Sequence, residues 1–257
     1  MSETVPVTPR LSATVLLVRD DPFEVLMVRR HAEAHFASAL VFPGGTIDAE
    51  DRSEVWFDHI TGAEELYEEA RTLRVAACRE LFEEASILLA DEVPAHCLTP
   101  AATARPFIDV IRDAGIKLRL DGFERFGHWL TPKSGLKRFD THFFLCRAPA
   151  GQEAVCDGGE TVALEWVAPV AALEQADALN ILFPTRMNLR KLARSADSAS
   201  ALADARTHPP VLVIPEPHRD ERGVTVYIPA EAGYGITEHF VPADRLVNAP
   251  PSTGEKR

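Results

Sequence analysis

The sequence predicts an α/β protein in which a mixed β-sheet lies between layers of helices. Apolar runs of strand length recur along the 257 residues and are separated by stretches with helical spacing. The two kinds of element do not alternate strictly, as they would in a doubly wound fold. With 46% hydrophobic residues, the chain is too apolar to be disordered, so we expect a packed core.

The first elements are predicted to form a β-hairpin. Ser12–Asp20 has the character of a buried strand, and a turn at Asp-Asp-Pro leads into a second strand at Glu24–Arg30. Pro43-Gly44-Gly45 then marks a sharp break, where the backbone can approach a ligand closely because glycine has no Cβ atom. Residues 46–70 are acidic and irregular, and we interpret them as an insertion.

The remaining elements follow from periodicity and from proline and glycine positions. The clearest helix runs from Thr72 to about Ala90. Further helices are expected at Ala63–Ala70, Ala101–Ala114, Val170–Leu179, Pro184–Arg194 and Ser198–Arg206. Further strands are expected at His128–Pro132, Phe139–Pro149 and Glu160–Pro169. The runs VLVIP and VTVYIP near the end of the chain are expected to form a small hairpin.

The helix predicted at 72–90 has two different faces. Its apolar side chains fall within one arc of roughly 140° on a helical wheel and predict a core-facing stripe: Val75, Cys78, Leu81, Phe82, Ala85, Leu88 and Leu89. The opposite arc carries Arg79, Glu80, Glu83 and Glu84. Carboxylates at positions i, i+3 and i+4 can reach a common point, and their mutual repulsion is reversed by a bound cation. An isolated E-x-x-E-E is most often a solvated face, so the surrounding residues decide its interpretation.

Those surrounding residues resemble a known family. The run Arg79-Glu80-Leu81-Phe82-Glu83-Glu84-Ala85-Ser86-Ile87 matches the second half of the signature G-x5-E-x7-R-E-U-x-E-E-x-G-U of the Nudix hydrolases, where U is aliphatic. It departs at Ser86, where the family normally has glycine. Phe42-Pro43-Gly44-Gly45 matches the strand and turn that lead into this Nudix box. The resemblance implies a Nudix-type α/β/α sandwich and metal-dependent pyrophosphohydrolase activity.

The spacing inside the box is unusual. Gly45 and Arg79 are 34 positions apart where the signature has 14, which indicates about 20 extra residues. The coenzyme A diphosphatase branch of mammalian peroxisomes and mitochondria has a similarly interrupted box, and the chain also resembles that branch in VFPGGTIDAED, HWLTP and RFDTHFFL. We therefore expect a Nudix domain over residues 10–195, with the insertion at about 46–70. An extension over 196–257, with further helices and the hairpin, is expected to pack on the same domain.

The resemblance implies roles for the residues of the box. In this family the helix glutamates bind Mg²⁺ or Mn²⁺, which matches the preference of such cations for carboxylate oxygens and the needs of diphosphate hydrolysis. Glu80 and Glu84 are implied to be the principal metal ligands. Glu83 is implied to be a ligand or a group that orients water. The turn at Gly44 and Gly45 is implied to lie against the substrate.

Arg79 is implied to pair with a carboxylate of the box and to fix the loop against the helix, with a surface salt bridge as the alternative. Counting back from Arg79 places Arg71 where the family has its loop glutamate. Glu68 and Glu69 are then the alternative partners if the insertion shifts the register.

Residues outside the box complete the predicted site. Glu160 lies between a glycine-containing loop and a strand, where a general base often lies in this family, with a plain surface glutamate as the alternative. Arg30 and Arg138 are candidate phosphate ligands, each with a solvated charge as the alternative. The histidines have no recognised ligand spacing, so structural or surface roles are favoured for His31, His35, His128 and His142.

Composition limits the partners and the location. The net charge of -12 disfavours a nucleic-acid polymer, because binding many phosphates requires a basic surface, and it leaves a small nucleotide possible. No apolar run is long enough to cross a bilayer and no secretory signal is visible, so we expect a cytoplasmic protein. The four cysteines show no C-x-x-C pair, which disfavours a cysteine zinc site or a disulfide framework. A homodimer is one assembly that the sequence allows.

The resemblance favours hydrolysis of coenzyme A or an acyl derivative to adenosine 3′,5′-bisphosphate and (acyl-)4′-phosphopantetheine. Hydrolysis of NADH, ADP-ribose or a nucleoside polyphosphate is the alternative within the same class. A Nudix-fold module that has lost catalysis and binds a nucleotide is the alternative of another class, and the unexpected residues Arg71 and Ser86 support it. All three helix glutamates are present, which favours an enzyme.

Overall fold

The computed structural model describes residues 7–30, 39–156 and 161–246. The strands of the main sheet are β1 (Arg10–Arg19), β2 (Glu24–Arg30), β3 (Leu40–Val41), β4 (Gly44–Thr46), β7 (Glu124–Leu130), β8 (Phe139–Arg147), β9 (Thr161–Val167) and β10 (Leu212–Val213). The helices are α1 (Glu68–Ala85), α2 (Pro100–Thr103), α3 (Phe107–Ala114), α4 (Pro169–Glu174), α5 (Phe183–Leu192), α6 (Ser198–Thr207) and α7 (Ala243–Leu246). Two smaller sheets pair β5 (Ile60–Thr61) with β6 (Leu118–Arg119), and β11 (Glu216–Asp220) with β12 (Gly223–Tyr227) and β13 (Glu238–Pro242).

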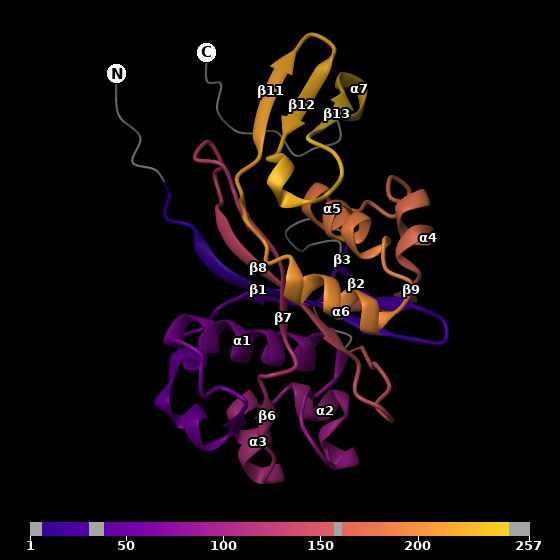
Figure 1. The fold of residues 1–257 in the computed structure, drawn as a ribbon. Helices are drawn as coiled ribbons and strands as arrows, with labels where there is room; N and C mark the ends of the chain where they lie inside the picture. The colour runs from indigo at the N-terminus through magenta and orange to yellow at the C-terminus, as the bar shows by residue number, and fades with distance from the viewer. Residues whose placement is uncertain (1–6, 31–38, 157–160, 247–257) are drawn as a thin grey trace.

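The main sheet lies between two helical layers (Figure 1). Its strand order is β10-β7-β8-β1-β2-β3, while β4 also pairs with β1 and β9 also pairs with β2. β1 is parallel to β8 and β10 is parallel to β7, whereas the other pairs are antiparallel. The predicted mixed sheet in an α/β/α sandwich is therefore confirmed, as is the opening hairpin, in which Arg19 pairs with Glu24.

The two faces of the sheet bury two separate apolar clusters, because alternate residues of a strand point to opposite faces. Along β1, Val15 and Leu17 join the cluster that includes α1 and α3, whereas Leu16 and Val18 join the cluster that includes α4, α5 and α6. No helix within the described residues is both long and apolar enough to cross a membrane.

Helix α1 lies across the sheet and ends sooner than its sequence pattern predicts. The apolar stripe is buried as expected at Val75, Cys78, Leu81, Phe82 and Ala85. The helix begins at Glu68, so the separate helix predicted at Ala63–Ala70 is wrong and its end is the first turn of α1. Leu88 is buried, but it lies in an irregular segment beyond the helix. The helix stops because the next residue, Ser86, adopts a left-handed conformation with φ 55° and ψ 28°.

Ser86 occupies the position where the Nudix signature has glycine, and its environment suits glycine. A non-glycine residue in the left-handed region is strained by roughly 1–2 kcal/mol, and the buried Ser86 hydroxyl has no hydrogen-bond partner among the described residues. We expect Ser86→Gly to raise the free energy of unfolding by about 1 kcal/mol, since the greater chain entropy of unfolded glycine offsets part of the gain. Urea denaturation checks this.

Ser86→Ala is the control, because it removes the hydroxyl and keeps the strained Cβ atom. It should gain less stability than the glycine variant. A glycine variant that is less stable than the wild type would show that the hydroxyl contributes an interaction here.

The inserted segment is folded onto α1. It contains two short 3₁₀ helices, at Glu50–Arg52 and Glu54–Asp58. Trp56 is 2% exposed and its ring lies 5.5 Å from that of Phe107, which in turn lies 5.4 Å from Phe82 of α1. β4 ends at Thr46 and pairs with β1, so the first residue of the predicted insertion belongs to the main sheet.

Other expectations also differ from the structure. The helix expected at Val170–Leu179 is the shorter α4, which ends at Glu174. The helix expected at Ala101–Ala114 is divided into α2 and α3, because Pro106 disfavours helical geometry in the residue before it. The hairpin expected from VLVIP and VTVYIP is also wrong. VLVIP contributes β10, which pairs with β7, whereas VTVYIP contributes β12, which lies between β11 and β13.

Candidate active site

The last two turns of α1 meet the glycine bend of β4. β4 is held against β1 by the register pairs Ala13 with Gly45 and Thr14 with Gly44. A Cβ atom at position 45 would collide with the Glu80 carboxylate, so any side chain there would push that carboxylate away from the bend. The strand register and the missing side chain therefore place the bend directly against the carboxylates of the helix.

Two of the three helix glutamates face the bend. The Glu80 carboxylate lies beside Gly45, and Oε2 of Glu84 accepts a hydrogen bond from the backbone N–H of Gly44 at 3.0 Å. Glu84 is 6% exposed, so this arc of the helix is not a solvated face. The third, Glu83, is linked to Glu80 through a shared arginine rather than through the bend.

That arginine is Arg79, and it joins the helix to the insertion. Its Nη1 donates to Glu80 at 2.8 Å and to Glu83 at 3.0 Å. Its Nε and Nη2 each donate to a different oxygen of Asp51 at 2.9 Å, and Nη2 also donates to the carbonyl of Thr46. Because Arg79 is 8% exposed, the surface salt bridge considered for it is wrong.

Asp51 is the partner of Arg79 that the sequence interpretation missed. Glu68 and Glu69, the expected alternatives, lie exposed in the first turn of α1. Counting forward from Gly45 with the spacing G-x5-E reaches Asp51, whereas counting back from Arg79 reaches Arg71. The forward count was the available signal, and it places the extra residues between Asp51 and Arg79.

Burial makes the carboxyl groups of Glu80 and Glu83 hard to ionise. Burial raises the pKa of Glu80 to about 7, with Arg79 acting against this and the charges of Glu83 and Asp51 adding to it. Burial also raises the pKa of Glu83, again opposed by Arg79. Burial lowers the pKa of Arg79, but the hydrogen bond to Asp51 and the charge of Glu80 outweigh it, so the net pKa is raised and the guanidinium stays charged.

The arrangement fits a divalent cation. Its donors are carboxylate oxygens, the ligands that Mg²⁺ and Mn²⁺ prefer. Glu80 and Glu83 share the guanidinium group of Arg79, and burial raises the pKa of both carboxyl groups although Arg79 acts against it, so a further positive charge would stabilise their ionised forms. A cation bound between the helix and the glycine bend would supply that charge.

Three predicted site residues lie elsewhere or outside the described residues. Arg138 is 8% exposed, and its guanidinium donates to the carbonyls of Thr131 and Val7, so it anchors backbone segments. Arg30 is the last residue of β2, and its side chain lies outside the described part of the structure. Glu160 also lies outside the described residues.

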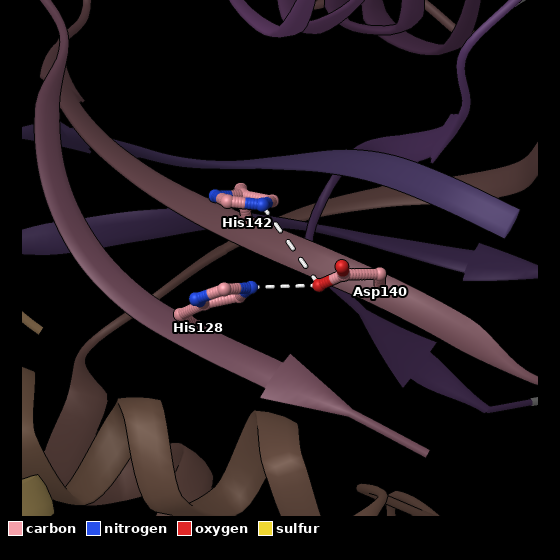
Figure 2. A group of neighbouring side chains, drawn as sticks. All are labelled: His128, Asp140 and His142. Carbon is pink, nitrogen blue, oxygen red and sulfur yellow. Dashed lines mark hydrogen bonds and ion pairs between the residues drawn. The ribbon is translucent and has the colours of Figure 1, made fainter. Parts of the chain in front are cut away.

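A further group of polar side chains lies on the same face of the sheet. His128 of β7 pairs in register with His142 of β8, and Asp140 precedes His142 by two residues (Figure 2). Burial, with the charge of His128, lowers the pKa of His142 to about 4. The sequence favoured structural or surface roles for these histidines. Strand pairing brings them together, and such pairing produces no recognisable spacing in the sequence.

The chain is similar in sequence to known proteins. A family model described as NUDIX domain matches residues 8–183. Human acyl-coenzyme A diphosphatase NUDT19 is 27% identical over 230 residues, which cover 68% of this chain and 61% of the human protein. The Xenopus laevis protein of the same name is 25% identical over 216 residues, covering 63% and 57%. The chain thus spans less than two thirds of the length of these relatives.

A solved structure shows the same fold. The crystal structure of a NUDIX hydrolase from Alicyclobacillus acidocaldarius superimposes with a TM-score of 0.64 at 27% sequence identity. The superposition covers 76% of this chain and 96% of the bacterial chain. Nearly the whole of that hydrolase therefore has a counterpart here.

Proposed function

The chain belongs to the NUDIX domain family, and from this premise we propose that it hydrolyses a diphosphate linkage in a nucleoside diphosphate derivative. The observation that carries the proposal is the meeting of Glu80 and Glu84 with a glycine bend, with Glu83 beside them. Glu80 lies against Gly45, Glu84 holds the N–H of Gly44, and Glu83 is tied to Glu80 through Arg79.

Each residue of this group has a proposed task. Glu80, Glu83 and Glu84 would hold Mg²⁺ or Mn²⁺, with the carbonyl of Gly45 as a further donor. A bound cation of this kind neutralises charge on a diphosphate and makes water a stronger nucleophile near neutral pH. The absence of side chains at the bend lets the diphosphate approach the backbone.

Arg79 acts as a positioning residue. It is charged, buried and bonded to Glu80 and Glu83 on one side and to Asp51 on the other. It therefore fixes the direction of two carboxylates relative to the loop. Glu160 is proposed as the general base and Arg30 as a phosphate ligand. The side chains of both lie outside the described part of the structure.

The two departures from the Nudix signature, Arg71 and Ser86, leave this group of residues intact. This favours an enzyme over a nucleotide-binding module. Asp51 supplies the acidic partner for Arg79 that Arg71 cannot supply. Ser86 adopts the left-handed conformation that glycine takes readily, so the helix still ends at the same point of the signature.

We propose coenzyme A or acyl-coenzyme A as the substrate, with adenosine 3′,5′-bisphosphate and (acyl-)4′-phosphopantetheine as the products. Support comes from the relatives named acyl-coenzyme A diphosphatase, at 25–27% identity. NADH, ADP-ribose and nucleoside polyphosphates are the alternative substrates.

A substrate panel tests this proposal. The full chain is incubated with Mg²⁺ or Mn²⁺ and, separately, with coenzyme A, an acyl-coenzyme A, NADH, ADP-ribose and a dinucleoside polyphosphate. Mass spectrometry of the products should show adenosine 3′,5′-bisphosphate from the first two, formed faster than any product of the others. Turnover of NADH without turnover of coenzyme A would reject the proposed substrate. If no compound were hydrolysed in the presence of metal, the proposed enzymatic activity would be rejected.

We also propose that residues 10–195 are the catalytic domain and that residues 196–257 pack on it as an extension. Ala201 and Ala205 of α6 lie in the same apolar cluster as α5. Tyr234, beyond β12, accepts a hydrogen bond from the indole N–H of Trp129 in β7 at 2.8 Å. These contacts tie the extension to the sheet.

A further inference from the structure

His128, Asp140 and His142 lie together on two neighbouring strands (Figure 2). The antiparallel register of β7 and β8 places His128 directly opposite His142. Their imidazole rings stack with centroids 4.0 Å apart and planes inclined by 27°. Asp140 lies two residues before His142, so its side chain is on the same face of the sheet. Three side chains with metal-binding atoms therefore point into one space.

The donor atoms are close enough to share one ion. Nε2 of His128 lies 2.6 Å from Oδ1 of Asp140, and Nε2 of His142 lies 3.8 Å from the same oxygen. One ligand atom from each of the three residues lies within 4.8 Å of the others. Ligands placed at about 2.0–2.2 Å from a tetrahedral ion are roughly 3–3.5 Å apart, so small side-chain rotations suffice.

This group is separate from the box carboxylates but close to them. Ala13 of β1 pairs with His142 on one side and with Gly45 on the other. Two strand spacings place the backbones of His142 and Gly45 roughly 10 Å apart. Ala13 belongs to the apolar cluster on the α1 face, so both groups open onto that face of the sheet.

We propose that His128, Asp140 and His142 bind a divalent transition-metal ion of the Zn²⁺ type at a second site beside the box. Two imidazole nitrogens with one carboxylate suit such an ion, whereas Mg²⁺ prefers oxygen ligands alone. The three side chains are 18%, 32% and 12% exposed, so water or a ligand oxygen can reach the remaining coordination positions.

The same contacts have a simpler interpretation without metal. His128 and Asp140 form a hydrogen bond, and His142 stacks on His128. A structural pair of this kind predicts no stoichiometric metal binding, whereas the proposed site predicts it, so a binding measurement distinguishes the two.

The test is a titration of the untagged full chain with Zn²⁺ in the presence of excess Mg²⁺. Calorimetry measures the binding, and NMR of the histidine ring nitrogens identifies the ligands. One Zn²⁺ should bind per chain and should shift the ring resonances of His128 and His142. His142→Ala and Asp140→Asn should each weaken binding at least about tenfold. His208→Ala, which removes the exposed histidine paired with Asp204, should bind Zn²⁺ as the wild type does.

Glu80→Gln separates this site from the box. The variant should keep its Zn²⁺ affinity even where hydrolysis is lost, so the two proposals can fail independently. The proposal is overturned if the wild type binds no stoichiometric Zn²⁺, if the ring resonances of both histidines stay unchanged, or if Glu80→Gln weakens Zn²⁺ binding as much as His142→Ala does.

Discussion

Glu80→Gln should lower kcat for diphosphate hydrolysis by at least about a hundredfold, which corresponds to about 2.7 kcal/mol of transition-state stabilisation. The substitution keeps the size of the side chain and removes the negative charge that would hold a divalent cation beside Gly45. The fold should remain intact, because the ionised form of this carboxylate is already disfavoured by burial. Steady-state kinetics and thermal denaturation with and without Mg²⁺ measure both effects.

Glu69→Gln is the matched control, since it makes the same chemical change on an exposed residue in the first turn of the same helix. It should keep wild-type kcat and the increase in Tm that Mg²⁺ produces, whereas Glu80→Gln should lose both. Equal activity in the two variants would remove Glu80 from the proposed metal ligands.

Asp51→Ala should lower the free energy of unfolding by about 3 kcal/mol, at the lower end of the range for breaking a buried ion pair. Asp51 is 2% exposed and accepts two hydrogen bonds from Arg79, so its removal leaves a buried guanidinium without its main partner. Glu80 and Glu83 still contact Arg79, which limits the loss. Equilibrium denaturation in urea measures it.

Asp48→Ala provides the comparison for that variant. Asp48 lies in the same loop, and its carboxylate is 4.0 Å from the same guanidinium, but its side chain is 66% exposed. An exposed pair contributes about 0–1 kcal/mol, so this variant should be nearly as stable as the wild type. If Asp51→Ala lost no more stability than Asp48→Ala, the buried pair would not be what joins the insertion to α1.

The end of α1 and the pairing of β10 are two features that the sequence pattern predicted wrongly. The apolar periodicity continues past Ala85 into Leu88, yet the helix ends because Ser86 takes a left-handed conformation. Periodicity predicts which residues face the core, but it does not predict where the hydrogen bonds of the helix end. The strand VLVIP was likewise recognisable as a strand, but its pairing with β7 depends on the path of the chain around α6.

By itself, the sequence determined the mixed sheet, the amphipathic helix with its glutamates, and the glycine bend. Each of these features depends on residues that are close in the sequence. Strand and helix periods repeat within a few positions, and glycine permits a sharp bend because it has no Cβ atom. Only the tertiary structure decided that Arg79 binds Asp51 and that His128 and His142 face each other. Those pairs are separated by 28 and 14 positions. Their contacts depend on how the chain returns to the sheet, which local periodicity does not record.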